Sequence, residues 1–237
     1  MAKIQDYNLY LTDFFSLLDI YLIKDLETLV KEIPARENGG GVGYPALQSI
    51  LSAMELLGLM LSGDKQSTAF KFYWDNYLAQ MFSQYAKKGL SDIFIHVMRN
   101  GTAHLFLVKT GVSVSKNGNN HLIPLSAKGQ IFLNVDLVVL HSHFLNTYEE
   151  IKKGLLKNPL PPSVQAGCDL FQAQMVEADN KVQDFIKANY PMGPAGSTTI
   201  VGSGVSGPTR FMGTTTSTSG TTNPLKGTIT PPPRIQP

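Results

Sequence analysis

Apolar residues recur every three to four positions along most of the first 190 residues, a spacing typical of helices that bury one face. The longest such pattern covers 5–33, and Pro34 is expected to end it. A second helix is predicted over about 45–61, closed by Ser62-Gly63. Because nearly every turn of this second helix is apolar, it should lie at the centre of the fold.

A third helical region, about 67–98, is rich in aromatic residues. Gly89 is expected to divide it, with Ser91 as the N-cap of the final section. The aromatic side chains at helical spacing are Phe70, Phe72, Tyr73, Trp74, Tyr77, Phe82 and Tyr85. This spacing favours packing in a core over a platform on which nucleic-acid bases stack.

After His104 the apolar pattern changes to a period of two, which is typical of strands. Short strands are predicted at 105–108, 112–114, 121–124 and 130–133. Asn117-Gly118 favours a tight hairpin turn. A β-hairpin insertion of about 105–133 therefore interrupts the helical pattern.

Two further helices are predicted after the insertion. Asn134 is expected to cap a helix that runs to about Leu156, and a last helix follows Pro161-Pro162. The last helix is expected to stop before Pro191. The expected fold is mainly all-α, an up-and-down bundle of about five helices in one domain, residues 1–190.

Residues 191–237 consist largely of Gly, Ser, Thr and Pro, and no Asp or Glu follows Asp184. Such a segment has too little apolar surface to offset the entropy lost on ordering, so a disordered tail is expected. Its few basic residues could assist RNA or membrane association, but an inert tail is favoured.

The formal net charge of +2 is too small to attract nucleic acid through bulk electrostatics, so an RNA partner would be met at a local site. Cys168 is the only cysteine, which excludes an internal disulfide and fits a reducing compartment. Residues 1–15 do not have the pattern of a secretory signal peptide. The apolar stretch 46–61 is too short, and too often interrupted by polar residues, to span a bilayer. A cytoplasmic protein without a membrane partner is expected.

One segment suggests chemistry, the RNGTAH segment at 99–104. It places a permanent cation, an amide and a titratable imidazole at the end of a long apolar helix, as Arg99, Asn100 and His104. Cleaving RNA without a metal requires proton transfer from the ribose 2′-hydroxyl and to the leaving 5′-oxygen, which suits His104. It also requires charge on the phosphate to be stabilised, which suits the fixed fork of Arg99.

Arg-Asn-(three residues)-His at the end of a long helix, in a mainly helical chain, resembles the HEPN domain (higher eukaryotes and prokaryotes nucleotide-binding). The resemblance covers about residues 5–156, with Arg99, Asn100 and His104 at the family's Arg, its polar neighbour and its His. It implies a metal-independent endoribonuclease of a toxin or defence system, a homodimer without a cofactor, and an antitoxin or regulatory partner. The insertion at 105–133 departs from the plainest form of the family and leaves the dimer packing open.

Five positions on an ideal helix turn a side chain by about 140°, so Arg99 and His104 would not share one face. Two arrangements could still bring an arginine and a histidine together. The helix frays at Asn100-Gly101 and lets His104 turn back, or a second subunit supplies the complementary pair across a two-fold axis.

A structural role for the same residues competes with catalysis. Glu55 is an acid inside the apolar central helix, and Arg99 is a candidate partner for it. Asn100-Gly101 would then only stop the helix, and His104 would be a hydrogen-bonded residue where helix passes to strand. The protein would be a non-catalytic interaction or nucleotide-binding module.

The remaining histidines give weaker signals. His96, three residues before Arg99, could assist phosphate binding, although a packed or solvated histidine is the more common case. His141 and His143 lie two apart on a predicted helix and make a poor metal pair. His121 beside the predicted turn is expected to be exposed. The sequence contains no Cys/His cluster, so no metal site is expected.

Overall fold

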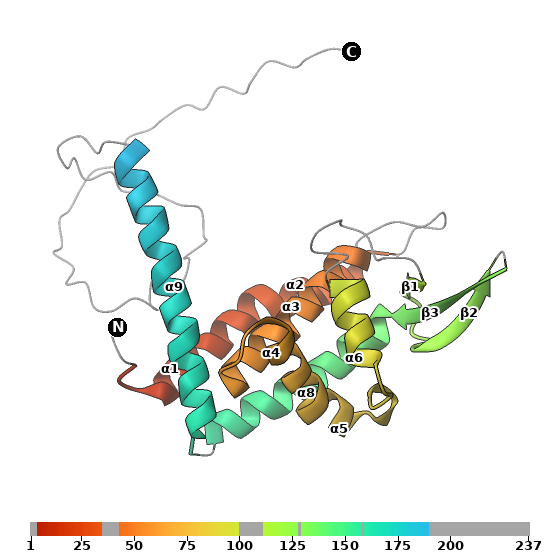
Figure 1. Ribbon diagram of the computed structural model, residues 1–237, viewed down its shortest axis with the longest axis horizontal. Coiled ribbons are helices and arrows are strands. Elements are labelled where there is room, and N and C mark those ends of the chain that lie inside the picture. The colour runs from red at the N-terminus through yellow and green to blue at the C-terminus, as the bar shows by residue number, and fades with distance from the viewer. Residues whose placement is uncertain (1–3, 35–42, 100–110, 128, 158, 190–237) are drawn as a thin grey trace, which may run out of the picture.

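The computed structural model describes residues 4–34, 43–99, 111–127, 129–157 and 159–189. Over these residues the fold is mainly α-helical with a small three-stranded sheet at one end (Figure 1), which confirms the expected fold class. The predicted strand at 105–108 and the predicted disordered tail, 191–237, lie outside the described residues.

The first helical run occupies nearly the whole predicted range 5–33. Its N-terminus is capped by Asp6, whose carboxylate accepts hydrogen bonds from the amides of Asn8 and Leu9 at 2.9 and 3.0 Å. The run alternates between α- and π-helical turns, as α1 (Tyr7–Leu17), η1 (Leu18–Ile23), α2 (Lys24–Glu27) and η2 (Thr28–Glu32).

The second helix, α3 (Gly43–Ser62), is the centre of the bundle, as its apolar sequence predicted. Eleven of its residues are buried. It contacts α2, η2, α4, η5, α8, α9 and β1. By length and composition α3 could also cross a membrane, but this is weak evidence because 61% of its most apolar window is buried inside the protein.

The aromatic region folds as several short helices rather than one. They are α4 (Gln66–Tyr73), η3 (Trp74–Leu78), α5 (Ala79–Met81), η4 (Ser83–Tyr85), α6 (Leu90–Ile93) and η5 (Phe94–Arg99). Gly89 divides the region as expected, because it adopts a left-handed conformation with φ of 78°. Gly89 is itself the N-cap of α6, so the prediction that Ser91 caps this helix is wrong.

Most of the large aromatic side chains are core residues. Phe70, Tyr73, Trp74 and Tyr85 are each at most 1% exposed, which confirms core packing at these positions. The polar atoms that they bury are satisfied: Trp74 Nε1 donates to the carbonyl of Tyr85 at 3.0 Å, and Tyr73 shares a hydrogen bond with the Thr147 hydroxyl.

The three strands are β1 (Val112–Ser115), β2 (Ile123–Ala127) and β3 (Gln130–Asp136), in the order β1-β3-β2. β1 runs parallel to β3, whereas β2 and β3 form an antiparallel hairpin around Gly129. The prediction of a hairpin turn at Asn117-Gly118 is therefore wrong. That turn leads from one edge of the sheet to the other, and its amides bind the side chain of Asp136 instead.

β3 leads directly into α8 (Leu137–Lys157), and α9 (Pro162–Asn189) follows it. The N-cap of α8 is Asp136, whose carboxylate accepts from the amides of Val138 and Val139 at 3.0 and 3.2 Å. The prediction that Asn134 caps this helix is wrong because the strand continues through Asn134 to Asp136.

Two glycines allow helices to approach α3 closely. A Cβ atom on Gly58 of α3 would lie 1.9 Å from the carbonyl oxygen of Ala69 in α4. A Cβ on Gly167 of α9 would lie 2.3 Å from the carbonyl oxygen of Met60. In both cases the obstacle is backbone, which cannot rotate away, so these two contacts require glycine.

We predict that Gly58→Ala lowers the free energy of unfolding by about 2–3 kcal/mol or more, because α3 and α4 must separate to admit the methyl group. Gly154→Ala on α8 is the matched control, since its Cβ would meet nothing within 4 Å and alanine should stabilise the helix by about 0.5–1 kcal/mol. Urea denaturation of both variants measures the difference. Equal stability of the two variants would contradict the close contact.

Candidate functional site

Arg99 is the last residue of η5, and the residues just before it fix where the chain leaves the bundle. Phe94, Ile95 and Met98 are each at most 1% exposed, and the Phe94 ring lies 4.6 Å from that of Trp74. Asn100 and His104 lie outside the described residues, as does the Arg99 side chain. The start of the RNGTAH segment therefore has a defined place in the fold.

The end of η5 lies at the end of the bundle that carries the sheet (Figure 1). The start of α3 reaches the same region, since a Cβ on Gly43 would lie 3.7 Å from Val114 in β1 and 3.6 Å from Leu137 in α8. A salt bridge of 2.6 Å between Lys71 and Asp92 ties α4 to α6 just before η5. α3 contacts both η5 and β1, so the helix that ends at Arg99 packs on the same central helix as the sheet.

Glu55 and His96, the two residues expected to act beside Arg99, differ in their surroundings. Glu55 is half-buried on α3, a helix that contacts η5, so the helix that carries Glu55 packs against the helix that ends in Arg99. His96 is exposed on η5. Because η5 is a π-helix, with hydrogen bonds between residues five apart, its turn is wider than that of an α-helix. His96 and Arg99, three residues apart on this wider turn, are therefore not neighbours as they would be on an α-helix.

A second polar cluster, which the sequence did not reveal, joins His121, Tyr85 and His143. The prediction that His121 is exposed is wrong: it is half-buried, and its Nδ1 accepts from the backbone amide of Asp136 at 3.1 Å. Its Nε2 therefore carries the proton and donates to the Tyr85 hydroxyl at 2.8 Å. The hydroxyl in turn donates to Nδ1 of His143 at 2.9 Å.

Burial controls the protonation of this cluster. It lowers the pKa of His121 to about 4, with His143 as a second cause, and it also lowers the pKa of His143. Burial raises the pKa of the Tyr85 hydroxyl. The Phe82 ring stacks on His143 at 3.9 Å. Both nitrogens of His121 are occupied, so the cluster joins η4, the sheet and α8 rather than presenting a free base.

Asp136 connects the sheet to α8. Its fully buried carboxylate accepts from the Ser115 hydroxyl at 2.9 Å and from the Asn117 and Gly118 amides, in addition to the two helix amides. Five donors compensate the burial of the charge. An Asp directly before an apolar helical run is a capping signal, and Asp136 carries it, two residues after the predicted cap Asn134.

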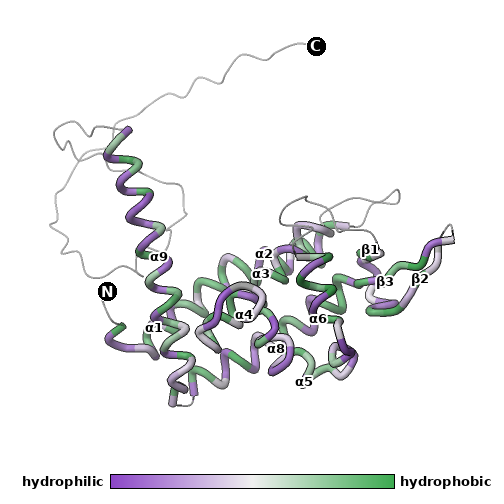
Figure 2. Tube along the Cα trace, viewed as in Figure 1, coloured by the Kyte–Doolittle hydropathy of each residue, from purple (hydrophilic) through white to green (hydrophobic). Residues whose placement is uncertain are grey.

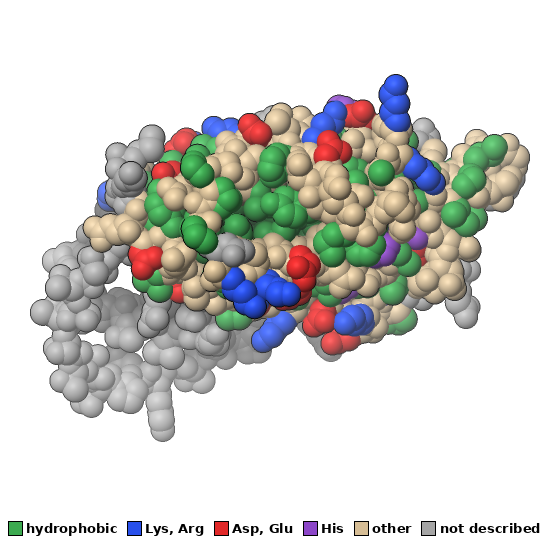
Figure 3. All heavy atoms as spheres, turned by 90° about the horizontal axis from the view of Figure 1, so that it is seen from below, with side chains coloured by type: hydrophobic (Ala, Val, Ile, Leu, Met, Phe, Trp, Pro, Cys, Tyr) green, Lys and Arg blue, Asp and Glu red, His purple; other side chains and the backbone are tan. Residues whose placement is uncertain are grey.

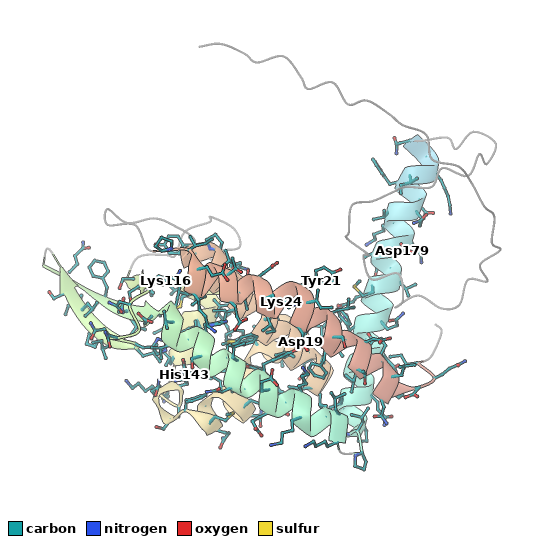
Figure 4. All side chains as sticks on the ribbon, turned by 180° about the vertical axis from the view of Figure 1, so that it is seen from behind. Asp19, Tyr21, Lys24, Lys116, His143 and Asp179 are labelled. Atoms are coloured by element: carbon teal, nitrogen blue, oxygen red, sulfur yellow. The ribbon has the colours of Figure 1, made fainter. Side chains whose placement is uncertain are left out.

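Lys116 closes the C-terminal end of the first helical run. Its half-buried ammonium donates to the carbonyl of Leu29 at 2.8 Å and to that of Ile33, and burial lowers its pKa. Figure 4 shows Lys116 between this run and the sheet. With Lys31 and Val138 it lines an open pocket of about 420 Å³.

The other candidate groups give no reactive site. Cys168 is buried, and burial raises its pKa to about 12, so it is a small core residue rather than a nucleophile. His141 is buried, and its Nε2 has no hydrogen-bond partner among the described residues. Within the described ranges, no three His, Cys, Asp or Glu side chains gather where they could hold a metal ion.

By its fold, the protein is a mainly α-helical bundle to which Asp136 fixes a three-stranded sheet. No known protein family matches the sequence, and neither a curated protein nor a solved structure is significantly similar to it. The function is therefore argued from the residues themselves.

We predict that the protein loses stability as the pH falls from 6.5 to 4. In this window unfolded His121 binds a proton at its usual pKa of 6.5, whereas folded His121 binds one only near pH 4. The unfolded state then holds more protons, so the free energy of unfolding should fall by about 2 kcal/mol, discounted for partial exposure of the ring.

Urea denaturation across this pH range measures the loss. His121→Gln should reduce the dependence, because glutamine does not titrate, and half-buried His143 should keep part of it. His96→Gln at an exposed position should leave the dependence unchanged. An unaltered pH dependence in His121→Gln would refute the assignment.

Proposed function

We propose that this protein is a HEPN-like, metal-independent endoribonuclease of a toxin or defence system, with Arg99, Asn100 and His104 as its site. The observation that carries the proposal is the position of the RNGTAH segment. It starts on the last residue of a helix anchored by Phe94 and Met98, in a mainly helical bundle. An anchored start suits a site whose charged group must be held in place.

The proposed reaction is attack of a ribose 2′-oxygen on the adjacent phosphorus. The 2′-hydroxyl loses its proton, the 2′-oxygen bonds to phosphorus, and the bond from phosphorus to the 5′-oxygen breaks as that oxygen gains a proton. His104 performs one of these two proton transfers, and water or the His104 of a second copy performs the other. Arg99 neutralises the growing charge on the phosphate oxygens, and Asn100 orients either residue. The products are a 2′,3′-cyclic phosphate and a 5′-hydroxyl.

Arg99 and His104 still need to approach the same phosphate. Either the chain turns back after Asn100, or two copies of the chain each contribute to a shared site across a two-fold axis. The second arrangement makes a homodimer necessary for activity. An antitoxin or regulatory partner would then act by covering the site or by separating the two copies.

The charge distribution supports a local RNA contact rather than a broad one. On the face seen in Figure 3, positive and negative side chains are interspersed. Lys31 and Lys116 line a pocket beside η2 and β1 and add positive charge there, although Lys31 also pairs with Glu27 at 2.9 Å. Exposed His96 on η5 is available to assist phosphate binding.

One observation favours a second candidate function. Half-buried Glu55 lies on α3, which contacts η5, and an ion pair between Glu55 and Arg99 would make the segment a structural brace. The protein would then be a non-catalytic interaction or nucleotide-binding module.

We predict that purified protein cleaves RNA in the presence of EDTA, and that His104→Ala and Arg99→Ala each lower the rate at least about a hundredfold. Arg99→Lys should recover only part of the activity, because lysine keeps the charge but not the bidentate fork. Lys181→Ala, which removes an exposed cation from α9, is the control and should retain the parent rate. Gel analysis of single- and double-stranded RNA measures the rates.

Cleavage that survives both His104→Ala and Arg99→Ala would overturn the proposal. The structural brace is favoured instead if the parent protein is inactive and if Arg99→Ala and Glu55→Ala each lower the free energy of unfolding by about 3 kcal/mol. In that case the double variant should lose about as much as either single variant, because both remove the same ion pair.

A further inference from the structure

The second half of α9 extends beyond the bundle. The first part of α9 is fixed to it: Val164, Gly167 and Cys168 are buried, and the ring of Phe171 lies 5.6 Å from that of Phe14. Gln172 and Ala173 are still half-buried, and beyond them the helix projects away from the other elements (Figure 1). This projecting part, 174–189, is about 24 Å long at the rise of an α-helix.

The apolar face of α9 continues along the projecting part. Buried Val164, Cys168 and Phe171 are followed at the same alternating spacing of three and four by the exposed residues Met175, Ala178, Val182 and Phe185. Met175, Val182 and Phe185 are 37%, 53% and 59% exposed. Figure 2 shows hydrophobic and hydrophilic residues alternating along this part. The spacing is that of the a and d positions of a two-helix seam.

We propose that this apolar stripe, Met175, Ala178, Val182 and Phe185, pairs with the same stripe of a second copy in antiparallel orientation. In the register centred near residue 180, Met175 meets the partner's Phe185 and Ala178 meets the partner's Val182. In the pair of Ala178 and Val182, a small side chain meets a larger one, and Met175 meets the larger Phe185 ring. The side chains between the two helices can therefore pack without a gap. Parallel pairing would instead oppose two alanines in one layer and two phenylalanines in another.

The length of the projecting part fits this register. Asn189, the last residue of α9, comes opposite the partner's Phe171, where the partner's own bundle begins. The two helices therefore overlap along the whole projecting part, with the bundles at opposite ends of the pair. A parallel pair would place both bundles at the same end and on the inner side of the seam, where they would collide.

The residues beside the stripe oppose pairing, so the apolar contact must supply the affinity. Glu177 pairs with Lys181 within the helix at 2.7 Å, but the register brings Asp179 near the partner's Asp179 and Lys181 near the partner's Lys181. Added salt screens these like charges. The dimer should therefore become tighter, not weaker, at high ionic strength.

A second copy fits the stripe better than the rest of this chain does. Residues 190–237 are dominated by Gly, Ser, Thr and Pro, which disfavour a helix with matching apolar spacing. The stripe also lies at the opposite end of the bundle from the sheet and the end of η5 (Figure 1). The pairing is thus independent of the proposed ribonuclease site and of any dimer formed across it.

Sedimentation velocity of the full chain over a range of concentrations tests the pairing. The expected result is a monomer–dimer equilibrium that tightens with added NaCl. Val182→Asp should weaken it at least about tenfold. Gln183→Asp, which adds the same charge one residue away and off the stripe, should leave it near the parent value. A chain that stays monomeric, or a dimer that Val182→Asp leaves intact, would overturn the proposal.

Cysteine crosslinking tests the register. A mixture of Ala178→Cys and Val182→Cys variants should form a disulfide between the two different chains faster than either variant does alone. Preferential crosslinking of Ala178→Cys with itself would indicate the parallel arrangement and contradict the proposal. RNA cleavage assayed on Val182→Asp is a separate readout, so the pairing and the ribonuclease proposal can fail independently.

Discussion

The close approach of two helices to α3 is the contact on which the other elements depend. At Gly58 and Gly167 backbone meets backbone, because neither position leaves room for a Cβ atom. The first contact places α4, which leads through η3 and α6 to η5 and Arg99. The second places the root of α9 and so sets the direction in which its projecting part leaves the bundle. A shift of α4 would therefore move the RNGTAH segment, and a shift of α9 would move the apolar stripe.

The sheet is positioned by a different kind of interaction, a buried carboxylate with five donors. Asp136 binds β1, the turn after it and the start of α8 at once. His121 adds a second connection, because it accepts from the Asp136 amide and links through Tyr85 to His143 on α8. Such satisfied polar contacts specify one docking geometry where apolar packing alone would permit several. The chain that follows the RNGTAH segment thus returns to a fixed sheet.

Local patterns in the sequence predicted the helices but not the contacts between distant segments. The three-to-four spacing placed the first run, α3, α8 and α9 within a few residues, since each buries one continuous face. Asn117-Gly118 resembles a hairpin turn locally, yet the strand that pairs with β1 lies beyond β2, and sequence spacing carries no such information. His121 looked exposed because its partners are Tyr85 and the Asp136 amide, 36 and 15 residues away. The RNGTAH segment was found from residue types alone, and its geometry depends on how the chain turns after Arg99.

The central claim is that Arg99, Asn100 and His104 promote attack by a ribose 2′-hydroxyl. The most direct measurement is cleavage, in EDTA, of an RNA in which the nucleotide 5′ to a mapped cleavage site carries 2′-hydrogen instead of 2′-hydroxyl. The account predicts that this single change abolishes cleavage at that position, and that the unmodified RNA yields 2′,3′-cyclic phosphate and 5′-hydroxyl ends. Cleavage of the deoxy-substituted site, or products with 5′-phosphate ends, would contradict it.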